Sequence, residues 1–173
     1  VAARTRQFDA GGIGGLQQRL AGVAVEAEAA RLDLGLHSGR CAAELVDARV
    51  DVLGYACLVA IMSMGKGYHR KSEERLHEIT VKEGNPTPVV TSAGALVAGL
   101  KTLGARRVSL VAPYLKPLTG LVVDYIEAEG IQVADSISLE IADNVEVGRQ
   151  DPMAPARIYR DLNLSGIDAL VLS

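Results

Sequence analysis

Aromatic side chains are scarce in this chain of 173 residues, which contains five Tyr, one Phe and no Trp. A hydrophobic core must therefore be built from Leu, Val, Ile and Ala. Hydrophobic residues make up 49% of the sequence, which supplies enough of them. The length suits one domain or two small ones with a sizeable core.

An excess of charge of either sign is also absent. Lys and Arg number 18 and Asp and Glu 21, which gives a formal net charge of −3, and the only compact basic run is His-Arg-Lys at 69–71. A nucleic-acid partner is therefore not expected. No apolar stretch reaches the roughly 18 residues that a membrane span needs, and the first residues lack a signal-peptide pattern. We expect a cytoplasmic protein without a membrane partner.

Cysteine is rare, with only Cys41 and Cys57 present. Two cysteines provide neither a disulfide framework nor a zinc-site spacing, so no metal site is expected, and a reducing compartment suits a free reactive thiol. The glycine-rich run at 11–15 is no dinucleotide-binding loop, because no strand precedes it and Gln17 replaces the third glycine of that motif.

Apolar residues recur at three- and four-residue steps in some segments and form short β-branched runs in others. This pattern predicts helices over 16–34, 38–48, 73–81, 93–103, 118–129 and 154–162, and strands over 50–56, 89–91, 108–112, 131–134 and 169–173. One helical turn and then a loop are expected over 58–68. Ser72 and Ser92 stand where helix caps are expected. Strands that alternate with helices predict an α/β fold with parallel sheets flanked by helices.

Cys57 comes directly after the strand predicted over 50–56. Ligands of open α/β sheets bind at the carboxyl ends of strands, and a helix N-terminus favours the thiolate form of a cysteine. Cys57 is therefore a candidate nucleophile. A free cysteine is also among the residue types most often buried as small apolar side chains, and the local sequence alone favours this second interpretation.

Three polar residues near the ends of other apolar runs also allow two interpretations. Tyr114 could be a core tyrosine with a solvated hydroxyl, Asn144 after Asp143 is by default a turn residue, and Ser92 is most simply a helix cap. A doubly wound sheet would instead bring such strand ends toward one ligand.

Four segments in consistent order resemble one protein family: Gly-Tyr-Ala-Cys-Leu-Val-Ala at 54–60, Val-Thr-Ser-Ala-Gly-Ala-Leu at 90–96, Val-Ala-Pro-Tyr-Leu-Lys-Pro-Leu at 111–118 and Ile-Ala-Asp-Asn at 141–144. The family is maleate cis-trans isomerase, in the aspartate/glutamate racemase superfamily, and the likeness runs from about residue 40 to 173. It implies two Rossmann-like or flavodoxin-like α/β lobes with the active site in the cleft between them. The lobes would be residues 1–92, of which 1–37 are atypical, and residues 93–173, which are incomplete at the C-terminus.

The resemblance also implies roles for individual residues. Cys57 would be the nucleophile that the first lobe contributes to a pair of cysteines, and Tyr114 and Asn144 would hold the substrate carboxylates. Further substrate contacts would come from Thr91, Ser92 and the backbone N–H groups of Leu58 and Val59.

The implied reaction is the cofactor-independent isomerisation of maleate to fumarate. Addition of the Cys57 thiolate to one alkene carbon gives a succinyl-cysteine species in which the former double bond rotates, and expulsion of the thiolate gives the trans product. Neutral hydrogen-bond donors would stabilise the developing charge. The expected partner is a small dicarboxylate, and a homodimer or higher homo-oligomer is expected.

Two features of the family are not matched. Its Val-Pro-Ser-Ser-Asn loop has no counterpart in residues 1–37, and its second cysteine directly follows a strand like 169–173, where this sequence stops. Two alternatives therefore stay open. One is a racemase or decarboxylase of another small acid that uses the thiol for proton transfer, and the other is a non-catalytic α/β module.

Overall fold

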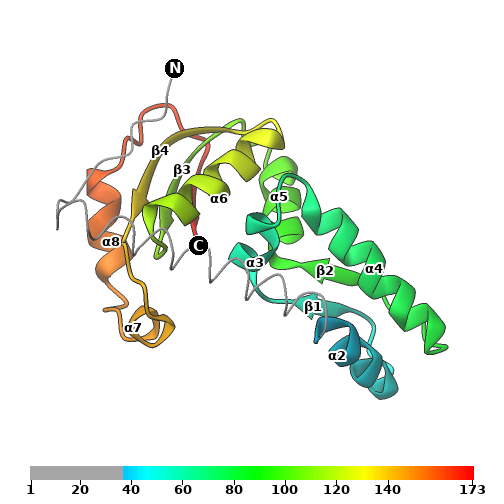
Figure 1. Ribbon diagram of the computed structural model, residues 1–173. Helices are drawn as coiled ribbons and strands as arrows, with labels where there is room; N and C mark the ends of the chain where they lie inside the picture. Colours follow the sequence, from blue (N-terminus) through cyan, green and yellow to red (C-terminus); the bar gives the residue numbers. More distant parts are fainter. Residues whose placement is uncertain (1–36) are drawn as a thin grey trace. The chain divides into compact units, whose positions relative to one another are not determined.

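The computed structural model describes residues 37–173. The helix expected over 16–34 and the glycine-rich run at 11–15 lie outside the described residues. The described chain forms two compact units, residues 37–98 and 99–173, which divide within helix α5 (Ser92–Thr102) (Figure 1). The sequence-based boundary between 92 and 93 stays a prediction.

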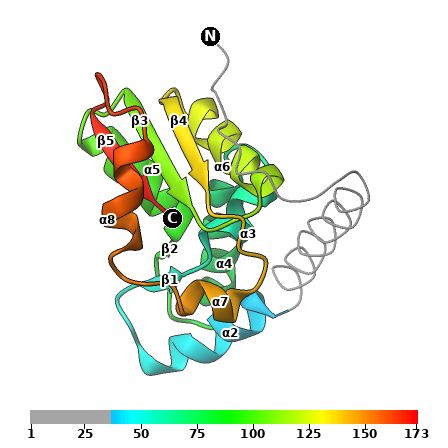
Figure 2. The same cartoon turned by 90° about the vertical axis from the view of Figure 1, so that its left-hand side faces the viewer.

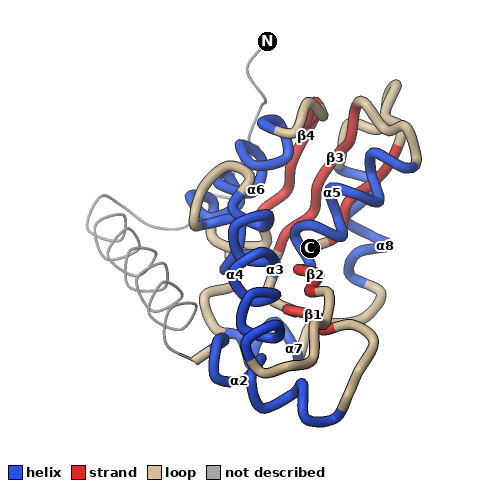
Figure 3. The backbone as a smooth tube through the Cα atoms, turned by 90° about the vertical axis from the view of Figure 1, so that its right-hand side faces the viewer, coloured by secondary structure: helices blue, strands red, loops and turns tan. Residues whose placement is uncertain are grey.

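The first unit contains a two-stranded parallel sheet with helices packed around it (Figure 3). Leu53 pairs with Val89 and Tyr55 pairs with Thr91. In chain order its elements are α2 (Ser38–Leu45), a 3-10 turn (Val46–Ala48), β1 (Leu53–Tyr55), α3 (Leu58–Ser63), α4 (Tyr68–Lys82), β2 (Val89–Thr91) and the start of α5.

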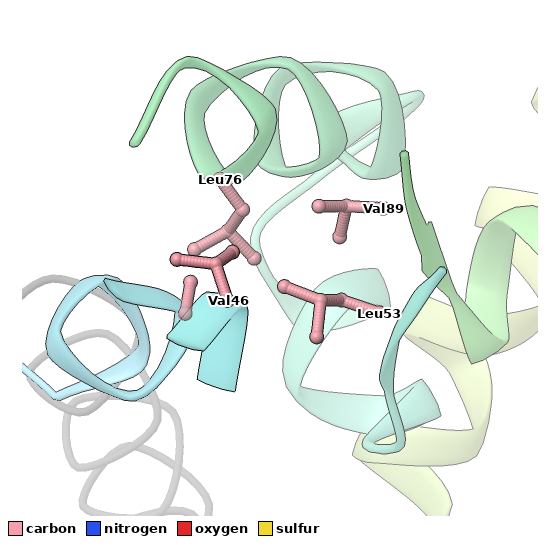
Figure 4. Packing of buried hydrophobic residues seen from close by; sticks show 5 residues of the cluster. Val46, Leu53, Leu76 and Val89 are labelled. Atoms are coloured by element: carbon pink, nitrogen blue, oxygen red, sulfur yellow. The ribbon is translucent and has the colours of Figure 1, made fainter. Parts of the chain in front are cut away.

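Aliphatic side chains from α2, the 3-10 turn after it, α4 and both strands make the core of this unit (Figure 4). The buried members are Ala42, Val46, Leu53, Leu76 and Val89, against which Val50, Tyr55 and Ile79 are packed. Each short strand contributes one buried residue to this cluster. The helices therefore stabilise a sheet that two short strands alone could not sustain.

The two predicted serine caps are wrong. Helix α4 begins at Tyr68, after Gly67 in the left-handed conformation (φ 68°), so Ser72 lies inside the helix and is buried. Helix α5 begins at Ser92, but its capping bond comes from the residue before, because the Thr91 Oγ1 accepts the Gly94 N–H at 2.9 Å. Threonine is also a good cap, although serine is preferred, and the sequence pattern does not show which of two adjacent hydroxyl residues makes the bond.

The second unit is built on a three-stranded parallel sheet in the order β4-β3-β5, with helices α6 and α8 on opposite sides of the strands (Figure 2). Its elements after α5 are β3 (Arg107–Ala112), α6 (Lys116–Ala128), β4 (Gln132–Ser138), α7 (Asn144–Gly148), α8 (Ala154–Ile158), a 3-10 turn (Tyr159–Asp161) and β5 (Ala169–Leu172). The predicted α/β class with parallel strands flanked by helices is confirmed.

Strand β3 is central, which explains why residues 108–112 are all buried. Parallel strands covered on both faces consist of nearly continuous apolar runs. Ser109 is the exception, and its hydroxyl donates to the Asn163 carbonyl oxygen at 2.8 Å. A buried polar group with a partner of this kind costs little stability.

Strand β4 extends to Ser138, beyond the segment predicted over 131–134. Its register against β3 shifts by one residue after the Val108–Val133 pair, so that Ser109 pairs with Asp135. Asp135 is buried, and its carboxylate accepts hydrogen bonds from the Ser136 and Asn163 N–H groups, each at 2.9 Å. These bonds allow β4 to continue through Asp135, although aspartate is unfavourable in strands and argues against a strand in the sequence.

Asp168 ties the start of β5 to the start of β3. Its Oδ2 accepts the Arg106 N–H at 2.8 Å and the Arg107 N–H at 2.9 Å, and its own N–H donates to the Arg107 carbonyl at 2.7 Å. The two bonds to the carboxylate, aided by the nearby arginine charges, hold the pKa of Asp168 below its usual range.

We expect Asp168→Asn to lower the thermal unfolding midpoint at neutral pH. A carboxyl with a lowered pKa stabilises the folded state above its unfolded pKa, about 3.9, and loses that contribution as the pH falls through the lowered folded value. The difference in unfolding midpoint between wild type and variant should therefore be largest near pH 6 and should shrink below about pH 4. Circular dichroism melts from pH 7 to pH 3 measure it, with Asp124→Asn on the exposed side of α6 as control. A difference independent of pH would contradict this role.

No helix in the described part of the chain combines the length and hydropathy needed to cross a membrane.

Candidate active site

Cys57 lies between β1 and α3, where it is the N-terminal cap residue of the helix. Its backbone is extended (φ −142°, ψ 92°), its side chain is half-buried, and the thiol makes no capping hydrogen bond. Behind it, Ala60, Ile61 and Met62 are buried in a helix that packs against α4. The thiol is therefore carried on a firmly packed element and is not itself used in holding that element together.

The first turn of α3 brings backbone donors next to Cys57. Leu58 and Val59 are its first two residues, and the Ile61 N–H bonds to the Cys57 carbonyl at 3.4 Å. The N–H groups at the start of a helix have no acceptor within the helix. Those of Leu58 and Val59 are thus candidate donors to a group that reacts with the thiol.

Thr91 ends the neighbouring strand β2, where it pairs with Tyr55 of β1, and Ser92 begins α5. Thr91 is fully buried, and its hydroxyl is engaged with Glu73 and Gly94. Ser92 is half-buried, and its Oγ is covered from solvent without a hydrogen-bond partner among the described residues. Of these two hydroxyls, the one on Ser92 is the more available to a ligand.

Tyr114 follows β3 in the second unit, and its hydroxyl lies 2.8 Å from the Ser173 Oγ. Ser173 follows β5 and donates its N–H to the Val111 carbonyl at 3.0 Å. The tyrosine is thus held at the carboxyl ends of two adjacent strands, the edge of a parallel sheet where ligands bind.

The chain after β4 runs beside the segment that carries Tyr114. Leu139, Glu140 and Ile141 donate backbone N–H groups to the carbonyls of residues 112, 114 and 113. Glu140 has a φ of 56°, a conformation that is strained for a residue other than glycine and often occurs at functional sites. Asn144 then begins α7, which Asp143 caps by accepting the Val145 N–H at 2.6 Å.

The structure therefore brings the sequence-predicted residues together in two groups, one in each unit. In the first unit, Cys57, Leu58 and Val59 follow β1, and Thr91 and Ser92 stand where β2 meets α5. In the second unit, Tyr114 and Asn144 follow β3 and β4.

Three polar residues near these groups were not anticipated. Ser138, at the end of β4, has a covered hydroxyl without a partner in the described chain, and Ser173 bonds Tyr114. Glu73, on the charged helix α4, accepts hydrogen bonds from Thr91. Of these three residues, only Ser173 carries a signal in the sequence, because it comes directly after an apolar run.

A pocket of about 190 Å³ lies elsewhere in the first unit, bounded by α2, α4 and β1. Cys41 is among its lining residues and Cys57 is not. Within residues 37–173, no cluster of three or more His, Cys, Asp or Glu side chains is arranged to hold a metal ion.

Comparison with known proteins gives a consistent result. The chain is 61% identical over 136 residues to the maleate isomerase of Geobacillus stearothermophilus, a match that covers 79% of this chain and 54% of the relative. The crystal structure of the maleate isomerase Iso from Pseudomonas putida has 58% identity and a TM-score of 0.76, and covers 78% of this chain and 54% of that one. The chain thus spans about half the length of the curated relatives it matches.

A third match is a Nocardia farcinica maleate cis-trans isomerase, a cysteine-to-serine mutant with a covalently bound succinylcysteine intermediate. It is 47% identical with a TM-score of 0.75, and covers 77% of this chain and 54% of that chain. The resemblance to maleate isomerases inferred from the four segments is thereby confirmed.

The family model described as arylmalonate decarboxylase matches residues 41–163, which include Cys57, Tyr114 and Asn144. This match covers most of the chain and both structural units. The chain therefore belongs to the arylmalonate decarboxylase family.

Proposed function

We propose that this chain supplies Cys57 as the nucleophile for the cofactor-independent cis-trans isomerisation of maleate to fumarate. The observation that carries the proposal is the Nocardia farcinica mutant, in which a cysteine has been replaced by serine and a succinylcysteine is nevertheless present. In that relative a cysteine other than the replaced one must hold the adduct. Of the two cysteines here, Cys57 stands at a strand end, as expected for a nucleophile, and Cys41 lies on α2.

The chemistry requires a reversible addition. The thiolate forms a C–S bond to one alkene carbon, and the π-electron pair moves to the neighbouring carbon and its carboxylate. The remaining C–C bond is single and rotates by about half a turn. The electron pair then returns to form the trans double bond, the C–S bond breaks, and the thiolate is regenerated, so no net oxidant or external proton is needed.

Charge that develops on the substrate carboxylate calls for fixed donors. We assign this role to the Tyr114 hydroxyl, which Ser173 orients, and to Asn144, with the N–H groups of Leu58 and Val59 beside the thiol. Ser92 contributes a covered hydroxyl, whereas Thr91 acts through its support of the β2–α5 turn. Neutral donors of this kind can bind a dianion without a dedicated arginine.

The test exposes the 173-residue chain to maleate and follows intact mass, with peptide mapping of the adduct and detection of fumarate by NMR. We expect an increase of one maleate mass, located on Cys57. Cys41 is the internal control, because it is exposed and any uncatalysed addition should occur there at least as fast.

Equal labelling of both cysteines would contradict the proposal. Turnover of a small acid without any adduct would instead favour the racemase or decarboxylase alternative, in which the thiol transfers a proton. Homo-oligomerisation stays a prediction, which light scattering of the same sample measures.

A further inference from the structure

We propose that Glu73 is a positioning residue that holds Ser92 and the first turn of α5 in place beside Cys57. The inference deepens the proposed function and rests on it. All the contacts that carry it lie within residues 37–98, and neither Glu73 nor Gly94 belongs to the residues assigned to substrate.

The Glu73 carboxylate closes a directed chain of hydrogen bonds. The Gly94 N–H donates to the Thr91 Oγ1, the Thr91 hydroxyl donates to the Glu73 Oε1, and each of these bonds is 2.9 Å long. The same Oε1 also accepts the Thr91 N–H at 2.9 Å. Because the carboxylate can only accept, the threonine hydroxyl must donate toward it and presents a lone pair to Gly94.

This arrangement depends on the absence of a side chain at position 94. A Cβ built on Gly94 would lie 2.2 Å from the Glu73 Oε1 and 3.1 Å from the Thr91 Oγ1. The backbone of Gly94 is not in the left-handed conformation. A glycine at this position is therefore explained by the close approach of Glu73 and not by a turn. Carboxylate, threonine and glycine thus form one packed unit at the start of α5.

The consequence reaches the candidate site through the pairing of the strands. Tyr55 and Thr91 are partners across β1 and β2, so Cys57 and Ser92 follow at the same edge of the sheet. Ser92 makes no hydrogen bond of its own through Oγ within the described residues. Its position is therefore set by its neighbour Thr91, and that of Thr91 by Glu73.

The experiment measures alkylation of Cys57 in a Cys41→Ser background, with iodoacetate and iodoacetamide as matched reagents. The ratio of the two rates reports how well the surroundings of the thiol accept a carboxylate, and a general loss of stability changes both rates together. We expect Glu73→Ala and Gly94→Ala each to lower the ratio by about tenfold, less than the roughly 100-fold that a 1 Å misplacement of a reacting group can cost. The double variant should be no lower than either single one.

Three further variants make the result decisive even if Glu73→Ala folds poorly. Glu73→Gln keeps an acceptor oxygen and should stay close to wild type. Glu73→Asp keeps the charge but withdraws the carboxylate from Thr91, so it should lower the ratio as Glu73→Ala does. Gly99→Ala is the matched control, since a Cβ there meets nothing within 4 Å.

Additive effects of Glu73→Ala and Gly94→Ala, or an unchanged ratio accompanied only by a lower melting temperature, would overturn the positioning role. The readout does not require maleate. Failure of the maleate adduct on Cys57 together with a clear coupling between positions 73 and 94 would therefore reject the proposed reaction and keep the positioning role.

Discussion

Cys57→Ala is expected to abolish both the maleate adduct and fumarate formation, with any turnover reduced by roughly 10⁴-fold or more, as for loss of other covalent nucleophiles. The side chain is half-buried and makes no capping bond, so its removal should leave the fold of α3 intact. A circular dichroism spectrum and melting curve equal to those of wild type would establish this.

Cys41→Ala is the control for the loss of a thiol as such, because Cys41 is exposed on α2 and lines a separate pocket. It should retain the adduct. Undiminished fumarate formation by Cys57→Ala would exclude Cys57 as the nucleophile. Loss of the adduct in both variants would indicate an indirect effect of thiol removal.

Leu110→Ala is expected to lower the free energy of unfolding by about 3–5 kcal/mol, as for other fully buried leucines. Leu110 is 0% exposed in the middle of β3, the central strand of its sheet, so a cavity there is enclosed by neighbours on both sides. Such a loss is a large part of the stability of a typical small domain. Urea unfolding followed by circular dichroism measures it.

The control for this substitution is Leu121→Ala, the same chemical change at a residue of α6 that is 38% exposed. Its cost should stay within about 1 kcal/mol. Equal midpoints for the two variants would show that the core of this unit is not where the structure places it.

The fold was predictable from the sequence where local patterns and tertiary structure agree. The helices expected over 93–103 and 118–129 are α5 and α6, shifted by one or two residues. The strand expected over 50–56 is reduced to β1 (Leu53–Tyr55), since regular pairing with β2 extends over three residues only. Strand β4 was underestimated because the bonds that satisfy Asp135 come from Asn163, far along the chain.

The candidate site was predictable only in part, for a related reason. Cys57, Tyr114 and Asn144 were identified through the four segments that resemble one family. The structure places Cys57 after a strand of the first unit's sheet, and Tyr114 and Asn144 after strands of the second unit's sheet. Glu73 could not be recognised in this way, because its helix has the charge pattern of a solvated face and its partner Thr91 lies in another element. Hydrogen bonds between side chains on different elements leave no periodic trace in a sequence.

The close approach of Glu73 to Gly94 also bears on how the sequence of this protein can drift. Any larger side chain at position 94 meets the far end of the Glu73 side chain, so the carboxylate must move aside and give up its place beside Thr91. Loss of the glutamate alone would leave Thr91 without its acceptor. A change at either position therefore disturbs the same hydrogen bonds of Thr91, and we expect positions 73 and 94 to vary together among homologous chains more often than independently.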